Sequence, residues 1–299
     1  MHSVLFEKIP STDPRLGRNI EHDERSRQFA YEEDTSAIVS AEHDSATPTQ
    51  NQGNGGSCTG QSSTKNMTYE TFWAAFEAEF SGILSTTDGA ANTKVAEGVY
   101  SDAEVLDGDG PYPPQDNGST GLSVAKVLLK RGWIAGYQHS FSFTAFQTAL
   151  SKQAVIVGTN WYTGMFDPTS SGELLATGKV EGGHEYVCRL QDLEKKRVGI
   201  QNSWGDDWGQ NGGQAWMSFD MMEQLLGENG DCTIFVPLGQ PAPTPVPPQP
   251  TPSPAPTPDD PQATFEAQAA HWVSLRHSSQ PNTTFEKQVQ EYLDWLSQQ

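Results

Sequence analysis

The chain has 299 residues, and its 38 acidic side chains outnumber the 18 basic ones to give a formal net charge of −20. This balance disfavours sequence-independent binding to nucleic acid and to anionic membranes, because both require Lys and Arg to displace counterions. No apolar run approaches the roughly 20 residues of a membrane helix, and no signal peptide is visible at the N-terminus. Three cysteines, an odd number, do not make a disulfide scaffold. We therefore expect an acidic cytoplasmic protein.

Composition divides the chain into four parts. Residues 1–30 are polar and mixed in charge, which indicates an N-terminal lead-in segment before a globular domain at 31–238. In the linker that follows, residues 239–262, ten of the eighteen residues from Pro241 to Pro258 are proline. Proline at that density excludes helix and central strand and favours extended polyproline II, a semi-rigid spacer. A docking ligand for an aromatic groove is the alternative.

Residues 263–299 predict a small module of two short helices. Apolar side chains recur at helical spacing from Phe265 to Val273, and Thr283 opens a capping-box pattern before a second apolar stripe. A module of this size rarely sustains a core alone. We expect it to associate with a copy of itself, with a protein partner or with the main domain, and a weakly folded tail is the alternative.

Within residues 31–238 the helical patterns come first and the strand patterns follow. Apolar spacing predicts helices over 68–80, from near Ser119 to the C-cap glycine Gly132, and over 143–151. The stretch from Gly82 to Pro114 shows no readable pattern. Apolar runs predict strands at 154–158, 186–190, 196–201, 215–219 and 232–236. Helices followed by strands favour the α+β class with an antiparallel sheet.

A glycine-rich stretch from Gln52 to Gly60 contains Cys58. Glycine allows a sharp turn and a close approach of the backbone to a substrate. A cysteine at a helix N-terminus lies at the positive end of the dipole, which favours thiolate over thiol. Gln52 can aim its side-chain amide at a developing oxyanion. Taken alone, a glycine-rich loop with a chance cysteine explains the stretch equally well.

Two further segments supply partners for a thiol nucleophile. His184 enters a predicted strand after Gly182 and Gly183, and Asn202 ends the next strand. A thiol needs a base to take its proton, and the base needs a third group that fixes its tautomer. Cysteine, histidine and asparagine occur in that order, each where an element begins or ends. Together they indicate a site for nucleophilic catalysis.

These segments resemble those of the papain-like cysteine peptidases over roughly residues 45–237. The most specific part is 202–213, which follows the family's Asn-Ser-Trp-Gly-x-x-Trp-Gly-x-x-Gly pattern. The resemblance implies a two-lobed α+β fold, with a helical N-terminal lobe and an antiparallel β-sheet or barrel in the C-terminal lobe. It implies that Cys58 is the nucleophile, His184 the general base and later acid, and Asn202 the residue that orients His184.

The resemblance also implies supporting roles for other residues. Gln52 and the Cys58 backbone N–H would form an oxyanion hole, and Trp204 would shield the His–Asn hydrogen bond from water. The loop that ends in Gly118 and Ser119 is similar to one that borders the substrate cleft. Gly118, Ser119, Gly183 and Trp204 are therefore our candidate substrate-binding residues, with a simple helix cap at Ser119 as the alternative.

The chain also departs from the family pattern. Gly55 stands where many members have a disulfide cysteine, and Thr59 replaces the tryptophan that usually follows the nucleophile, as in bacterial and viral branches. The long inhibitory propeptide is absent, so we do not expect control by zymogen cleavage. Cys188 and Cys232 lie in apolar patterns that predict buried thiols, with a disulfide between them as the alternative.

The implied function is hydrolysis of peptide bonds in a polypeptide substrate through an acyl-enzyme intermediate. No metal-ligand spacing, phosphate loop or dinucleotide fingerprint occurs, so we expect no metal and no cofactor. Two alternatives stay open. One is a phage- or bacterium-encoded cell-wall peptide hydrolase with the same triad, acting from a virion or in the host-cell cytoplasm. The other is a catalytically silent interaction scaffold.

Overall fold

The computed structural model describes residues 4–11 and 13–245. Most of the predicted proline-rich linker and the whole predicted helical module at 263–299 lie outside these residues. Within the described ranges, no helix combines the length and the apolar character needed to cross a lipid bilayer.

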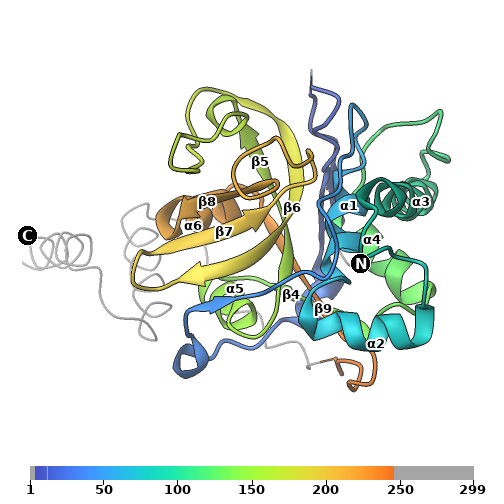
Figure 1. Ribbon diagram of the computed structural model, residues 1–299. Helices are drawn as coiled ribbons and strands as arrows, with labels where there is room; N and C mark the ends of the chain where they lie inside the picture. The colour runs from blue at the N-terminus through green and yellow to red at the C-terminus, as the bar shows by residue number, and fades with distance from the viewer. Residues whose placement is uncertain (1–3, 12, 246–299) are drawn as a thin grey trace, which may run out of the picture. The chain divides into compact units, whose positions relative to one another are not determined.

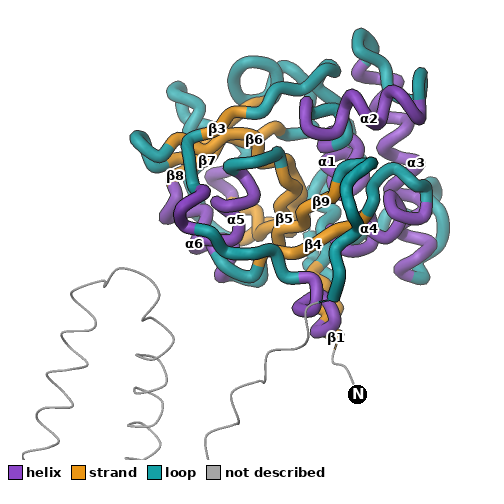
Figure 2. Tube along the Cα trace, turned by 90° about the horizontal axis from the view of Figure 1, so that it is seen from below, coloured by secondary structure: helices purple, strands orange, loops and turns teal. Residues whose placement is uncertain are grey.

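Four helices form one side of the described domain, and α2, α3 and α4 contribute to one core (Figure 1). That core includes Phe72, Val99 and Leu128, all nearly or fully buried. Figure 2 shows α2 and α3 on the side of the molecule away from β7 and β8. The helices are α1 (Cys58–Asn66), α2 (Glu70–Phe80), α3 (Gly89–Asp107) and α4 (Gly121–Lys130).

The other side is an antiparallel sheet in the order β4-β9-β5-β6-β7-β8, with the short β3 paired to β6. Successive side chains of β5 point to opposite faces, so Val155 joins a core with α5 and α6 while Ile156 joins the core of the helices. The elements are β3 (Ala41–Glu42), β4 (Gly136–Ser140), α5 (Phe143–Leu150), β5 (Val155–Tyr162), β6 (Val180–Asp192), β7 (Arg197–Gln201), β8 (Gln214–Ser218), α6 (Phe219–Gly227) and β9 (Asp231–Val236).

The N-terminal residues do more than lead into the domain. β1 (Val4–Glu7) pairs antiparallel with β2 (Ile20–Asp23). Figure 1 shows this dark-blue part of the chain between β6 and α1. Three short 3-10 helices complete the described residues: η1 (Glu24–Phe29), η2 (Thr35–Ala37) and η3 (Thr163–Met165).

The predicted fold class, helices first and an antiparallel sheet second, is confirmed. The helix expected near Ser119 begins two residues later, because the side chain of Thr120 caps it by accepting from the Ser123 backbone N–H. A cap at Ser119 is therefore wrong. The stretch from Gly82 to Pro114, which had no readable pattern, contains the 19-residue helix α3.

Candidate functional site

β6 and β7 bring His184 and Asn202 together. The strands pair antiparallel with Val187 opposite Gln201, so the residue after β7 lies beside the middle of β6. His184 Nε2 lies 2.7 Å from Asn202 Oδ1. Because an amide oxygen only accepts, Nε2 donates the proton and Nδ1 keeps its lone pair. The Ser203 backbone N–H also donates to Asn202 Oδ1, at 2.8 Å, which holds the amide in this orientation.

Two tryptophan rings enclose the imidazole of His184. The ring centroids of Trp161 and Trp204 each lie 4.8 Å from the centroid of His184. His184 is fully buried, and this burial lowers its pKa to about 4, although the hydrogen bond with Asn202 acts in the opposite direction. His184 is therefore neutral near pH 7, as a general base must be.

Gln52 is fixed by the residue that follows Asn202. Ser203 Oγ donates to Gln52 Oε1 at 2.6 Å, and the Gln52 backbone N–H donates to the Ser203 carbonyl at 2.9 Å. The Gln52 amide nitrogen is thereby turned away from Ser203. It donates to the carbonyls of Gly55, at 2.7 Å, and of Arg15, at 3.0 Å. One turn, Asn202–Ser203, thus orients both the imidazole and a candidate oxyanion donor.

Cys58 is the first residue of α1, and its exposed fraction is 0%. Burial raises the pKa of the thiol to about 12, although the backbone amides of Glu185 and Gly17 act to lower it. The helix N-terminus led us to expect a thiolate, but here loss of solvent outweighs the dipole. Cys58 and His184 are both neutral in this state, and the thiol lies against the main chain of Gly17.

Residues 13–19, here called the covering segment, account for this burial. On the helical side, the Ser119 backbone N–H donates to the Gly17 carbonyl at 2.9 Å, and the Asn19 N–H donates to the Ser119 carbonyl at 2.8 Å. On the sheet side, the Arg18 N–H donates to the Gly183 carbonyl at 3.1 Å. The covering segment is therefore held as an extended peptide between the two sides of the domain.

At two glycines, the covering segment and the domain approach each other too closely for a side chain. A Cβ atom on Gly17 would lie 1.9 Å from the carbonyl oxygen of Gly56, two residues before Cys58. A Cβ atom on Gly183 would lie 2.3 Å from the Arg18 carbonyl oxygen. Glycine is required at both positions for this contact to form.

The N-terminal end of the covering segment lies on Trp204 and Phe166. Asp13 pairs with Arg15, whose Nη2 lies 2.8 Å from Asp13 Oδ2. The Arg15 guanidinium lies 4.2 Å from the ring centroid of Trp204 and 5.2 Å from that of Phe166. These distances suit cation–π contacts.

All four candidate substrate-binding residues adjoin the covering segment. Ser119 and Gly183 exchange main-chain hydrogen bonds with it, and Trp204 packs under Arg15. A Cβ atom on Gly118 would lie 2.4 Å from the Gly17 carbonyl oxygen. Their role toward a substrate stays a prediction, and in this state a piece of the chain itself occupies their surface.

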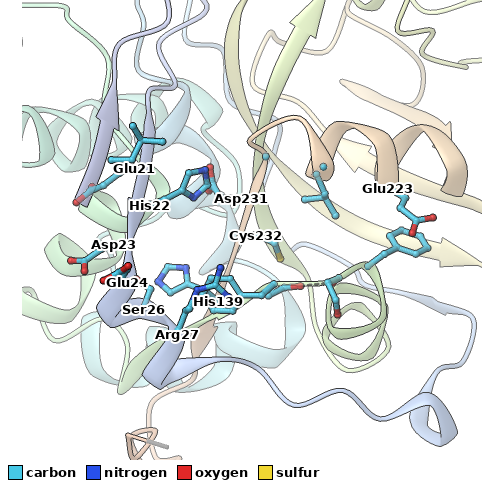
Figure 3. A pocket seen from close by; sticks show the side chains of 18 residues that line it. Glu21, His22, Asp23, Glu24, Ser26, Arg27, His139, Glu223, Asp231 and Cys232 are labelled. Carbon is cyan, nitrogen blue, oxygen red and sulfur yellow. Dashed lines mark hydrogen bonds between the residues drawn. The ribbon is translucent and has the colours of Figure 1, made fainter. Parts of the chain in front are cut away.

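An open cavity of about 610 Å³ lies beside η1, β4 and α6 and includes Asp231 in its lining (Figure 3). Figure 3 shows acidic side chains in its lining, among them Glu21, Glu223 and Asp231, together with His139. Cys58, His184, Asn202 and Gln52 do not line this cavity. The residues that the sequence predicts to be catalytic therefore lie at the covered site and not at this cavity.

Several residues of the site carry no sequence signal. Trp161 and Ser203 position His184 and Gln52, but each is a single residue in an otherwise ordinary strand or turn. Arg15 and Arg18 lie in a polar stretch that we interpreted as a lead-in. In the structure Asp13 and Arg15 form a local pair within this stretch.

The remaining cysteines, Cys188 and Cys232, are buried and free, so the disulfide considered as an alternative is not formed. Both belong to the core between the sheet and α5 and α6. They contribute apolar packing there.

No protein-family model matches the chain, and no curated protein sequence matches it. Among solved structures, it is similar to xylellain, a cysteine protease from Xylella fastidiosa, at 16% identity and a TM-score of 0.47, over 77% of this chain and 98% of that chain. It is similar to a recombinant stem bromelain precursor at 16% identity and a TM-score of 0.47, over 76% of this chain and 78% of the other. It is also similar to digestive procathepsin L 3 of Tenebrio molitor larval midgut, at 11% identity and a TM-score of 0.46, over 76% and 75% of the two chains.

Proposed function

We propose that the chain is a cysteine peptidase that hydrolyses peptide bonds in polypeptides through Cys58, His184, Asn202 and Gln52. The observation that carries this proposal is the 2.7 Å contact of His184 Nε2 with Asn202 Oδ1. That contact leaves Nδ1 of His184 as the basic atom. The residue that follows His184 on β6 is Glu185, and its backbone amide lies at the Cys58 thiol.

The proposed reaction begins when His184 Nδ1 takes the Cys58 proton and the sulfur attacks the substrate carbonyl carbon. The oxyanion accepts from Gln52 Nε2 and from the Cys58 backbone N–H, one of the unpaired donors of the first turn of α1. His184 then donates its proton to the leaving amine, which leaves a thioester. A water that His184 deprotonates hydrolyses the thioester and restores the thiol. Asn202 keeps Nε2 protonated throughout.

We propose further that the covering segment keeps the enzyme latent. With Cys58 fully buried and its pKa near 12, neither substrate access nor thiolate formation is available until residues 13–19 leave. The covering segment, residues 13–19, does the blocking.

The test uses the full chain with Gly17→Ala, since a Cβ there would lie 1.9 Å from the Gly56 carbonyl oxygen and displace the segment. We expect this protein to digest denatured casein, and a further Cys58→Ala or His184→Ala change to abolish digestion. Asn202→Ala should cost less, because it alters orientation rather than chemistry. Absence of casein cleavage, with Cys58 accessible to iodoacetamide in a folded protein, contradicts the peptidase proposal.

Purified peptidoglycan, digested in parallel with casein, separates a general peptidase from the cell-wall hydrolase alternative. Faster release of wall peptides than of casein fragments would favour the wall hydrolase. Equal inertness toward both would favour the silent scaffold.

A further inference from the structure

The side chain of Arg18 fills a buried pocket beside the catalytic site. None of it is exposed to solvent. Its Nε donates to Asp231 Oδ2 at 3.0 Å, and its Nη2 donates to the Asn229 carbonyl at 2.6 Å and also contacts Asp231 Oδ2. A guanidinium removed from water to this degree requires such charged and polar partners.

Both sides of the domain build the walls of this pocket. A Cβ atom on Gly158 of β5 would lie 2.4 Å from Glu185 Oε2, 2.7 Å from Arg18 Nε and 2.9 Å from Asp231 Oδ2. A Cβ atom on Gly121 of α4 would lie 2.8 Å from Asp231 Oδ1 and 2.9 Å from Glu185 Oε1. The two glycines thus leave space for two carboxyl groups, supplied by β6 and β9, the strands on either side of β5.

Arg18 leaves part of this pocket unused. Among the described residues, neither Glu185 carboxyl oxygen has a hydrogen-bond partner, and Arg18 Nη1 and Asp231 Oδ1 also lack one. Glu185 is fully buried, and burial together with the charge of Asp231 raises its pKa. The pocket therefore holds more acceptors than its present occupant engages.

The pocket lies where a peptide bound over Cys58 would direct a side chain. Arg18 follows Gly17, whose backbone adjoins the thiol, and Glu185 follows His184. The main-chain groups that hold Arg18 and its neighbours belong to Gly183 and Ser119. These groups would be equally available to a substrate after the covering segment leaves.

We propose that this pocket recognises an arginine side chain of the peptide substrate, and that Arg18 occupies it in the substrate's place while the covering segment is bound. This inference rests on the proposed peptidase function. Once Arg18 leaves, the largely buried carboxylate of Asp231 remains without a cation, and an acidic or apolar side chain would leave it uncompensated. The planar guanidinium fork reaches Asp231 and the Asn229 carbonyl together, as Arg18 does, which an ammonium group does less well.

The test uses the full chain with Arg18→Ala, which empties the pocket and removes an anchor of the covering segment. The substrates are acetylated tripeptide coumarin amides of alanine in which one position carries arginine or citrulline. Citrulline matches arginine in shape but has no charge. We expect arginine to exceed citrulline at one position by at least ten-fold in kcat/KM.

Substitutions of the acidic residues in the pocket test whether they cause the preference for arginine over citrulline. Glu185→Gln with Asp231→Asn should bring the arginine-to-citrulline ratio below three-fold while citrulline peptides are still cleaved. Asp220→Asn, an exposed acid on α6, is the matched control and should keep the ratio. Cleavage with a ratio within three-fold at every position overturns the pocket inference and leaves the peptidase proposal standing. If Arg18→Ala does not fold, the Gly17→Ala chain takes its place.

A chain that cleaves no peptide although Cys58 is alkylated contradicts the peptidase proposal instead. The pocket is then judged by binding, as the rise in unfolding temperature of the Arg18→Ala chain with N-acetyl-argininamide or N-acetyl-citrullinamide. A rise with the arginine compound alone supports the pocket, and equal effects of the two overturn it.

Discussion

Arg15 and Arg18 lie three residues apart on the covering segment, yet the domain holds them in opposite ways. The Arg15 side chain is 31% exposed, pairs with Asp13 of the same segment and rests on the face of Trp204. The Arg18 side chain is 0% exposed and pairs with Asp231, far along the chain. After release, water can replace most of the polar interactions of the Arg15 side chain, but few of those of the buried Arg18 side chain. Release should therefore begin at Arg15, and the departure of Arg18 should limit it.

The largest expected effects come from replacing each arginine with alanine, which tests the difference between the two side chains directly. Removing one partner of a buried ion pair costs about 3–5 kcal/mol, so Arg18→Ala should speed iodoacetamide labelling of Cys58 on the order of 100-fold or more. Arg15→Ala removes a partly exposed pair and a cation–π contact, and should speed it by about five-fold. Peptide mass spectrometry of the labelled cysteine measures both rates. A larger effect of Arg15→Ala would reverse our ordering of the two ends.

Steric exclusion tests the middle of the covering segment. In Gly17→Ala the new Cβ meets the Gly56 carbonyl, and overpacking of this kind costs about 1–3 kcal/mol. Labelling of Cys58 should rise by roughly 5- to 150-fold. Gly227→Ala is the control, since nothing lies within 4 Å of a Cβ there. Unchanged labelling in Gly17→Ala would mean that residues 13–19 do not shield the thiol.

Acid should weaken binding of the covering segment through His184. Its pKa is about 4 while the segment is bound and returns toward 6.5 when solvent enters, so the released state binds more protons between these values. Binding is then strongest above pH 6.5 and weakens as the pH falls toward 4, by at most about 30-fold at pH 5.

Hydrogen exchange at residues 16–19, corrected for its intrinsic pH dependence, measures this loss. His184→Gln has no titrating ring and is the reference protein. If the native protein gains protection on acidification relative to His184→Gln, the imidazole does not drive release.

The smallest effect concerns the hydrogen bond of Gln52 with Ser203. Ser203→Ala removes the hydroxyl that orients the Gln52 amide, a hydrogen bond worth about 0.5–1.5 kcal/mol. Casein turnover in the Gly17→Ala chain should fall by about two- to ten-fold, with kcat more affected than KM. Ser203→Thr, which keeps the hydroxyl, should restore most of the turnover. A normal kcat in Ser203→Ala would show that Gln52 needs no support from Ser203.

The catalytic candidates were readable from the sequence, whereas much of what surrounds them was not. Cys58, His184 and Asn202 are of reactive or orienting types and stand where predicted elements begin or end. Helix α3 escaped prediction because it packs closely on α1 through small side chains: a Cβ on Gly60 would lie 2.3 Å from the Ala96 carbonyl oxygen. Such an interface needs no stripe of large apolar residues.

The path of the covering segment had no local signal at all. Arg18 is a charged residue in a polar stretch, which normally predicts exposure. Its burial depends on Asp231, which lies 213 positions further along the chain. Pairings between residues so distant leave no periodicity, so only the folded chain shows them.

The covalent tie between the covering segment and the domain has a consequence for competition. Because blocker and site belong to one molecule, dilution of the protein cannot separate them. A short tether gives its ends a local concentration in the millimolar range. A peptide substrate must therefore bind well or arrive in excess before it displaces residues 13–19. A single cut in the chain after Asn19 would leave those residues attached to the domain by non-covalent contacts alone, among them the pairing of β1 with β2.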